Sequence, residues 1–536
     1  RPPPLARASR GEPRLLDIAR PVIQPAIPLD ELPPVIDVSS SEPPPPPRLS
    51  LEELLALAAE NQAKLEAFDA EPPPPPPAPR PQAPPIVADD EALRERFGVT
   101  IDYPTLIAER ARDAVTDLGM LGRMRRPMPE ERWASGEVTE ERMLTRVDAL
   151  LACGSESWHD IVRLLDDRPL PDPELTFGIV FFLCSVAGDD TFDEAMRLVS
   201  LSDLADEEMR VMLADALVFA PHPRIDETLP RWLGDSSADR RALAAEVLRR
   251  RGTLLGPHLE QASRDSDPRV LASVAHALCA IERGRAAGTL GWLLAHEDER
   301  VARAALETST RLRSPFGYER AVQLVQEDRG DFASASVIVA VSGDRDARRV
   351  LEDEVAGEGH PGVLRALGWY GDVGFVPFLL GRLRNGDEET MLAALDALER
   401  LTGASLTDAD PEPTYSPEER PFVRERVDYE PGATLSMDAD VWESWWRAHG
   451  RAADPKRRYR WGKPWALGDL VHELRHEQFP QRDRPYAALE LGFRSHTQCT
   501  LDWTAWVQRQ RKQVAEWTSR VSTSSSPPGS WPARER

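Results

Sequence analysis

The segment LVHELRHEQF at residues 470–479 contains His472, Glu473 and His476 in the H-E-x-x-H order of zinc proteases. In that chemistry the two imidazoles hold the metal, and the glutamate acts as general base toward the metal-bound water. A third protein ligand is also needed, and the residues after His476 lack the G-x-x-H extension. Glu490 is the nearest candidate, but its segment AALELGF is typical of a packed helix.

A helix over residues 466–478 would turn the two histidines away from the protein. Its apolar stripe consists of Leu467, Leu470, Val471 and Leu474. At about 100° per residue, His472 and His476 lie roughly 140° and 180° from Leu467. We therefore expect this motif on a solvated face, without a metal or cofactor. A metallohydrolase that uses His472, Glu473 and His476 is the alternative.

Composition limits the partners of the chain. Its 536 residues carry a formal charge of −24, with a pI near 5.0, which argues against general binding to nucleic acid or anionic membranes. No apolar run approaches the roughly 18–20 residues of a membrane helix.

Scattered cysteines without metal-ligand spacing favour buried thiols in a reducing compartment. They are Cys153, Cys184, Cys279 and Cys499. The first residues lack a signal-peptide pattern, so we expect a cytoplasmic protein.

The first 95 residues are rich in proline. Before residue 90 lie 24 of the 50 prolines, including the runs at 43–47 and 72–77. Such a segment buries too little surface to fold, so we expect a disordered tail. Between the runs, residues 50–69 predict an amphipathic helix that either docks on a partner or forms only transiently within a spacer. Its candidate docking residues are Leu51, Leu54, Leu55, Leu65 and Phe68.

From residue 206 onward, the sequence repeats about every 30 residues. Each unit opens on a polar turn, continues into a helix with an apolar residue seven positions later, and ends with a second helix. The units begin at Asp206, Ser237, Asp267, Asp298, Asp328, Gly359 and Asp387. The residues seven positions later are Leu213, Ala244, Val274, Ala305, Ala335, Ala366 and Ala394. Helix pairs of this length bury their faces by stacking, so the pattern predicts an α-solenoid.

The short units resemble HEAT repeats of the phycobilisome-lyase type. The segments RVDALLACGSESW, KRRYRWGKPW and YAALELGF, with L-T-G at residues 401–403 and the helix DADVWESWWRAHG, are similar to an uncharacterised proteobacterial HEAT-repeat family. Genes of that family often neighbour type VI secretion clusters. The resemblance covers roughly residues 110–510 and implies an accessory role near that apparatus, but no activity.

Two enzymatic alternatives come with this resemblance. Some HEAT-like hydroxylases hold a di-iron centre with four His-Glu dyads, whereas this array offers one dyad, His296-Glu297. Bilin lyases use similar repeats, so a bilin-lyase-like activity is the other alternative. His276, inside a repeat helix, is expected to be a hydrogen-bonded interface residue. No P-loop or nucleophile signature appears, and we expect a protein that is not an enzyme.

Two further features have a structural and a functional interpretation. Trp442, Trp445 and Trp446 are expected to form the packed face of a C-terminal cap rather than a ligand-binding patch. The basic runs at 249–251 and 454–460 are expected to be solvated helix ends rather than a surface for an acidic partner.

The sequence therefore predicts an all-α protein with a HEAT-like solenoid, helical caps and a disordered tail. We expect it to act as a scaffold for a protein partner. The expected domains are a tail at 1–95, an N-terminal cap at 96–165, the repeat array at 166–406, an insertion at 407–437, a C-terminal cap at 438–520 and a second tail at 521–536.

Overall fold

The computed structural model describes most of the chain after residue 101. The described ranges are 102–129, 131–165, 171–327, 332–355, 360–407, 435–477, 479–497, 501–521 and 527–531. The larger of two compact units contains the described residues from Ile107 onward, and residues 102–106 belong to the other. The predicted tail at 1–95 and the docking residues Leu51, Leu54, Leu55, Leu65 and Phe68 lie outside the described residues.

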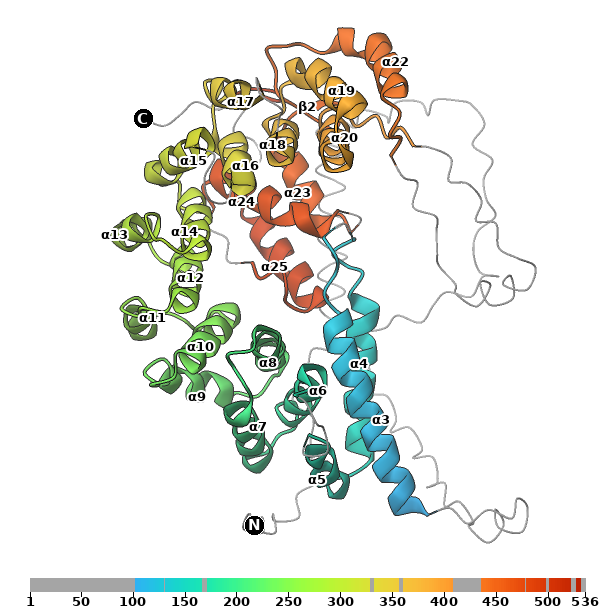
Figure 1. The fold of residues 1–536 in the computed structure, drawn as a ribbon, viewed down its shortest axis with the longest axis vertical. Coiled ribbons are helices and arrows are strands. Elements are labelled where there is room, and N and C mark those ends of the chain that lie inside the picture. The colour runs from blue at the N-terminus through green and yellow to red at the C-terminus, as the bar shows by residue number, and fades with distance from the viewer. Residues whose placement is uncertain are drawn as a thin grey trace, which may run out of the picture. The chain divides into compact units, whose positions relative to one another are not determined.

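The fold is the predicted all-α solenoid, with 22 α-helices in the described part of the chain (Figure 1). Alternate helices contact one another in sequence and form a core row. The core row consists of α6 (Pro173–Leu183), α8 (Glu207–Phe219), α10 (Ala238–Arg251), α12 (Pro268–Ala277), α14 (Glu299–Arg311), α16 (Phe332–Ser342), α18 (Pro361–Tyr370) and α20 (Glu388–Thr402). The helices between them pack on the core row as a flanking row. The flanking row consists of α7 (Asp189–Leu201), α9 (Arg224–Trp232), α11 (Gly256–Ala262), α13 (Arg283–Leu293), α15 (Pro315–Glu327), α17 (Ala347–Val355) and α19 (Val376–Asn385).

Five of the repeats begin where a side chain caps a core-row helix. Asp206 accepts a hydrogen bond from the Met209 amide at 2.8 Å, and Asp387 accepts one from the Thr390 amide at 2.9 Å. Ser237, Asp267 and Asp298 do the same for α10, α12 and α14. Such caps satisfy amides that the first turn of a helix leaves without a partner.

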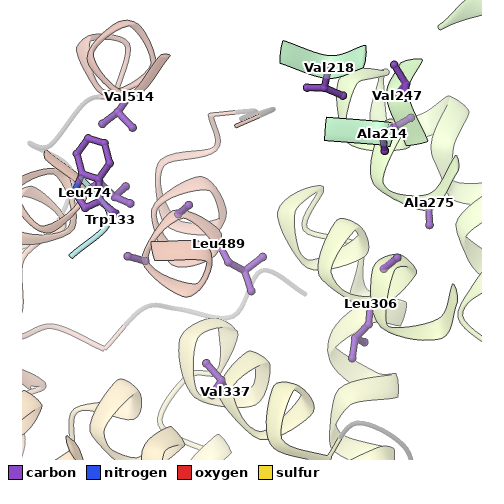
Figure 2. Packing of buried hydrophobic residues seen from close by; sticks show 14 of the residues in the cluster. Trp133, Ala214, Val218, Val247, Ala275, Leu306, Val337, Leu474, Leu489 and Val514 are labelled. Carbon is purple, nitrogen blue, oxygen red and sulfur yellow. The ribbon is translucent and has the colours of Figure 1, made fainter. Parts of the chain in front are cut away.

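The residue seven positions into each unit lies at the centre of the packing. All seven of these side chains are 0% exposed, because the small ones let neighbouring core-row helices approach closely. Helix α16 is buried along its whole length except at the partly buried Ala333, since α24 covers the face that its repeat neighbours leave open. The buried apolar residues of the array belong to one cluster, and Figure 2 labels members of it from Ala214 to Val337.

Two further segments complete the unit. The N-terminal one contains α3 (Tyr103–Met124) from Ile107 onward, α4 (Glu137–Ala152) and α5 (Glu156–Arg163). The C-terminal one contains α22 (Ala439–His449), strands β1 (Tyr459–Arg460) and β2 (Lys463–Pro464), α23 (Leu467–Arg475), α24 (Arg484–Ser495) and α25 (Val507–Ser519). Short 3-10 turns lie at Leu278–Ala280, Val373–Phe375, Gly450–Ala452 and Gln481–Asp483.

The C-terminal segment does more than cover one end of the solenoid. Helix α22 packs on α19, as a cap would, but β1 contacts α20, α24 contacts α16 and α14, and α25 contacts α4. The chain thus returns along the core row from its last helix to the N-terminal segment (Figure 1). No helix in the described ranges has both the length and the apolar character needed to cross a membrane.

Candidate functional site

The predicted H-E-x-x-H segment lies next to a short hairpin that covers the ends of α18 and α20. Strands β1 and β2 pair through the turn Trp461–Gly462, where both residues have positive φ, 50° and 71°. A two-residue turn of this kind matches the twist of the strands, and glycine adopts it without strain. The Trp461 amide donates to the Arg400 carbonyl at 2.7 Å, and the Gly462 amide donates to the Leu401 carbonyl at 3.1 Å. The hairpin thereby satisfies carbonyls at the C-terminal end of α20.

Arginine side chains serve the same purpose at other core-row helices. Arg458 donates to the Tyr370 carbonyl at 2.8 Å and to the Trp369 carbonyl at 2.7 Å, at the end of α18. Arg251 caps α8 by donating to the Ala220 carbonyl at 2.9 Å, and Arg494 caps α16 by donating to the Val341 carbonyl at 2.6 Å. A cation is favoured at these positions because helix dipoles place partial negative charge at the C-terminal end.

Four charged side chains form a buried charge network beneath the hairpin. Arg458 pairs with Glu490 at 2.6 Å, and Arg460 pairs with Glu490 at 2.8 Å and with Glu473 at 3.2 Å. All four side chains are at most 5% exposed. The Trp461 indole N–H donates to the other oxygen of Glu473 at 2.5 Å. Both oxygens of the motif glutamate are therefore engaged inside the protein.

The two carboxylates of the network have opposite pKa shifts. Burial raises the pKa of Glu473 and outweighs the opposing effect of Arg460. Burial also acts to raise the pKa of Glu490, but Arg458 and Arg460 together hold that pKa below its ordinary value. Glu490 is the ion that balances the two guanidinium groups, so the network depends on its charge.

The motif histidines lie where the sequence predicts. His472 and His476 are exposed, with ring centroids 5.5 Å apart, and His476 already lies beyond the end of α23. The prediction of a solvated motif is wrong for Glu473, which lies on the buried face beside Leu470 and Leu474. Across the described ranges, no group of three or more His, Cys, Asp or Glu residues is placed to hold a metal ion.

A second buried set of charges, here the Asp215 cluster, joins the core row to both terminal segments. Asp215, which is 0% exposed, accepts from Arg250 at 2.6 Å and from the Arg126 Nε–H at 2.8 Å. Arg250 also donates to the Thr504 hydroxyl at 2.5 Å and lies 3.5 Å from Asp502. Burial acts to lower the pKa of Arg250, but Asp215 and Asp502 reverse this and raise it.

Glu140 makes the adjoining connection. Its carboxylate accepts from the Arg125 Nε–H at 2.9 Å and from the Val507 amide at the start of α25 at 2.9 Å. Burial raises the pKa of Glu140 to about 7 against the opposing influence of Arg125. Figure 2 shows Trp133 in one buried cluster with Leu474 of α23 and Val514 of α25, and its indole N–H donates to the His476 carbonyl at 3.0 Å.

The expectation that both basic runs are solvated holds for Lys456 and Arg457, which are exposed, but is wrong for four other arginines. Arg250, Arg458 and Arg460 are buried, and Arg251 is partly buried with its guanidinium paired to Asp226 at 2.7 Å. A signal was present in the sequence, because a glutamate inside the apolar segment AALELGF requires a buried cation. The sequence does not indicate which arginines provide it, because Glu490 lies 30 residues from Arg460.

The other residues singled out in the sequence have local roles. Trp442 is 1% exposed and donates to the Ser436 carbonyl at 2.8 Å, whereas Trp445 is only partly buried and stacks on His449.

His296 accepts from the Asp298 amide at 3.0 Å. His276 is partly buried in α12, where burial lowers its pKa to about 3. Of the cysteines, Cys184 and Cys279 are buried thiols, Cys153 is partly buried, and Cys499 lies outside the described residues.

Comparisons with known proteins add little to this geometry. No family model and no curated protein matches the chain. Among solved structures, one match is the crystal structure of an engineered protein from the Northeast Structural Genomics Consortium, at 17% identity, covering 56% of this chain and 88% of that one. Its TM-score is 0.25, so it supports no conclusion about fold or function.

Proposed function

We propose that the chain is a non-catalytic scaffold that presents its helical repeats to a protein partner in the cytoplasm. The row of stacked helices is the observation that supports this most directly, because solenoids provide extended binding surfaces. Large apolar side chains lie exposed on its flanking row, with Trp292 at 44% and Phe316 at 59%. Exposed aromatic side chains of this size are enriched among residues that anchor protein interfaces.

The engagement of Glu473 favours this proposal over the metallohydrolase alternative. A general base must reach the metal-bound water with a free carboxylate oxygen. Both oxygens of Glu473 are instead held by Arg460 and Trp461, on the side of α23 opposite the solvent. An accessory role in type VI secretion is part of the proposal, and it rests on the sequence resemblance alone.

The proposed tail helix provides the experimental test. Proline runs on both sides of residues 50–69 would tether a helix near the solenoid and raise its effective concentration at a partner. Replacing Leu54 and Leu55 with Asp is expected to reduce capture of the partner from the native organism about tenfold, since apolar anchors dominate such interfaces. Thermal unfolding of the solenoid should not change. Quantitative affinity capture followed by mass spectrometry measures the first effect, and circular dichroism measures the second.

Matched variants complete this test. Leu15→Asp with Leu16→Asp places the same charges in the tail outside the predicted helix and should leave capture unchanged. A shortened chain that starts at residue 96 should capture as poorly as the Leu54/Leu55 variant. Equal capture by the shortened and full-length chains would show that the tail is only a spacer. Failure of every variant, and of the full chain, to enrich any protein specifically would contradict the scaffold proposal itself.

A further inference from the structure

Glu140 lies at the junction between the N-terminal segment and α25. Its carboxylate is 5% exposed, and both of its oxygens accept from the Val507 amide at the start of α25, at 3.1 Å and 2.9 Å. One oxygen also accepts from the Arg125 Nε–H, and Arg125 in turn donates to the Thr504 carbonyl at 2.6 Å, in the loop before α25. One buried carboxylate thus caps α25 and holds the arginine that fixes the preceding loop.

The other charged groups around Glu140 come from every element packed against it. Their pairs are Glu137 of α4 with Arg511 of α25, Glu477 after α23 with Arg511, Arg126 after α3 with Asp215 of α8, and Arg250 of α10 with Asp215, Glu246 and Asp502. Arg484 of α24 stacks on Trp133 and Trp503, and burial rather than a charged neighbour lowers its pKa. Among the residues that the structure describes, Glu140 therefore pairs with Arg125 alone.

Glu140 has weaker electrostatic compensation than the neighbouring buried carboxylate Asp215. Two arginines pair with Asp215, whereas the single partner of Glu140, Arg125, is also attracted by Asp215 and Asp502. Glu137 lies one turn earlier on α4, and its charge repels that of Glu140. A buried carboxylate in such surroundings binds a proton more readily than one in water.

The neutral form of Glu140 is compatible with the closed junction. A protonated carboxyl keeps an oxygen that can accept from the Val507 amide. Arg125 would still be attracted by Asp215 and Asp502, and its guanidinium lies 3.8 Å from the centre of the Phe219 ring. Protonation of Glu140 therefore removes one buried charge without leaving Arg125 free of favourable contacts.

A cavity beside the carboxylate provides room for solvent. It measures about 150 Å³ and is lined by Glu140, Arg125, Thr504 and Val507, among others. One molecule of liquid water takes up about 30 Å³, so the cavity can hold a few waters. Glu140 borders this space, and its titration does not require the core to open.

We propose that Glu140 makes this junction a proton-sensitive latch, in which attachment of α25 to α4 takes up a proton and tightens as the pH falls from 8 to 6. The direction follows from the pKa of Glu140, which burial raises from its ordinary value of 4.5 to about 7 in the closed junction. The stabilisation from the bound proton is fully present below about pH 4.5 and is lost as the pH rises through about 7.

Hydrogen exchange of the full chain tests the latch, measured by mass spectrometry at pH 6 and pH 8 and corrected for the intrinsic exchange rates. Protection of α25 should fall about tenfold from pH 6 to pH 8, because the closed junction loses its proton over this range while a solvated glutamate is already ionised. Glu140→Gln is neutral at every pH and has nearly the same shape. Its α25 should therefore show equal protection at both pH values.

Glu141→Gln is the matched control, because it removes the same charge from the exposed side of α4 and should keep the tenfold fall. Should Glu140→Gln fail to fold, as judged by circular dichroism, the wild type at the two pH values still decides. Equal protection of wild-type α25 at both would overturn the latch. So would an equal fall in α18 and α20, or a tenfold fall in folded Glu140→Gln. None of these outcomes involves partner capture, so the scaffold proposal is tested separately.

Discussion

Glu490→Gln is expected to lower the free energy of unfolding by about 3–5 kcal/mol, because it removes one partner from a buried set of ion pairs. The variant keeps the volume of the side chain but removes the ion pair of Arg458 and leaves Arg460 with Glu473. Both guanidinium groups are at most 1% exposed, so water cannot replace the lost charge. Arg458 also caps α18, and the loss should therefore loosen the hairpin from the end of the core row.

Urea unfolding followed by tryptophan fluorescence measures this effect, since Trp461 and Trp465 belong to the hairpin region. Limited proteolysis should also cut the Glu490→Gln variant earlier than the wild type within residues 453–477. Glu260→Gln is the matched control, because Glu260 pairs with Arg264 while remaining 67% exposed. Exposed pairs contribute about 0–1 kcal/mol. Equal stability of Glu490→Gln and Glu260→Gln would show that the network is not needed to hold the C-terminal segment.

Asp215→Ala should have a similar effect at the other end of the C-terminal segment, about 3–5 kcal/mol. Asp215 is the buried carboxylate that Arg250 and Arg126 share, and Arg250 reaches Thr504 in the loop before α25. Removing it leaves Arg250, which is 4% exposed, with the more distant carboxylates of Asp502 and Glu246. The attachment of α25 to the first core-row helices should therefore weaken.

Hydrogen exchange measured by mass spectrometry locates this change. Protection should fall in α25 and in the loop 125–129, while α16, α18 and α20 keep theirs. Asp193→Ala removes a carboxylate of the same type from an exposed pair with Arg224 and should change neither stability nor exchange. Uniform loss of protection along the whole solenoid would contradict a local role for Asp215.

The repeat pattern predicted the solenoid because the residues that start and pack each helix lie within the same unit. A capping Asp or Ser fixes where most core-row helices begin, and a buried, mostly small residue seven positions later fixes how closely the neighbouring helices approach. Both signals lie within a dozen residues of each other, and the structure uses both in the units that begin at Ser237, Asp298 and Asp387.

The buried charges were not predictable in this way. Arg250 and Thr504 lie 254 residues apart, and Arg458 caps a helix that ends 88 residues earlier. Apolar periodicity identified Leu470 and Leu474 as buried residues of α23. It did not identify Glu473 as buried, because a glutamate is expected to be exposed until its partners are known. The solvated interpretation of the basic runs was wrong for Arg250, Arg458 and Arg460 for the same reason. Charged residues are interpreted as exposed unless a partner is known, and these partners are distant in sequence.

The central claim is that the H-E-x-x-H segment holds the fold together and binds no catalytic metal. Its most direct test is the zinc content of the purified full-length chain. Inductively coupled plasma mass spectrometry after expression with added zinc should find well below one zinc per chain, with the same value for His472→Ala. About one zinc per chain in the wild type, lost in His472→Ala but retained in the exposed control His449→Ala, would contradict the claim and favour the metallohydrolase.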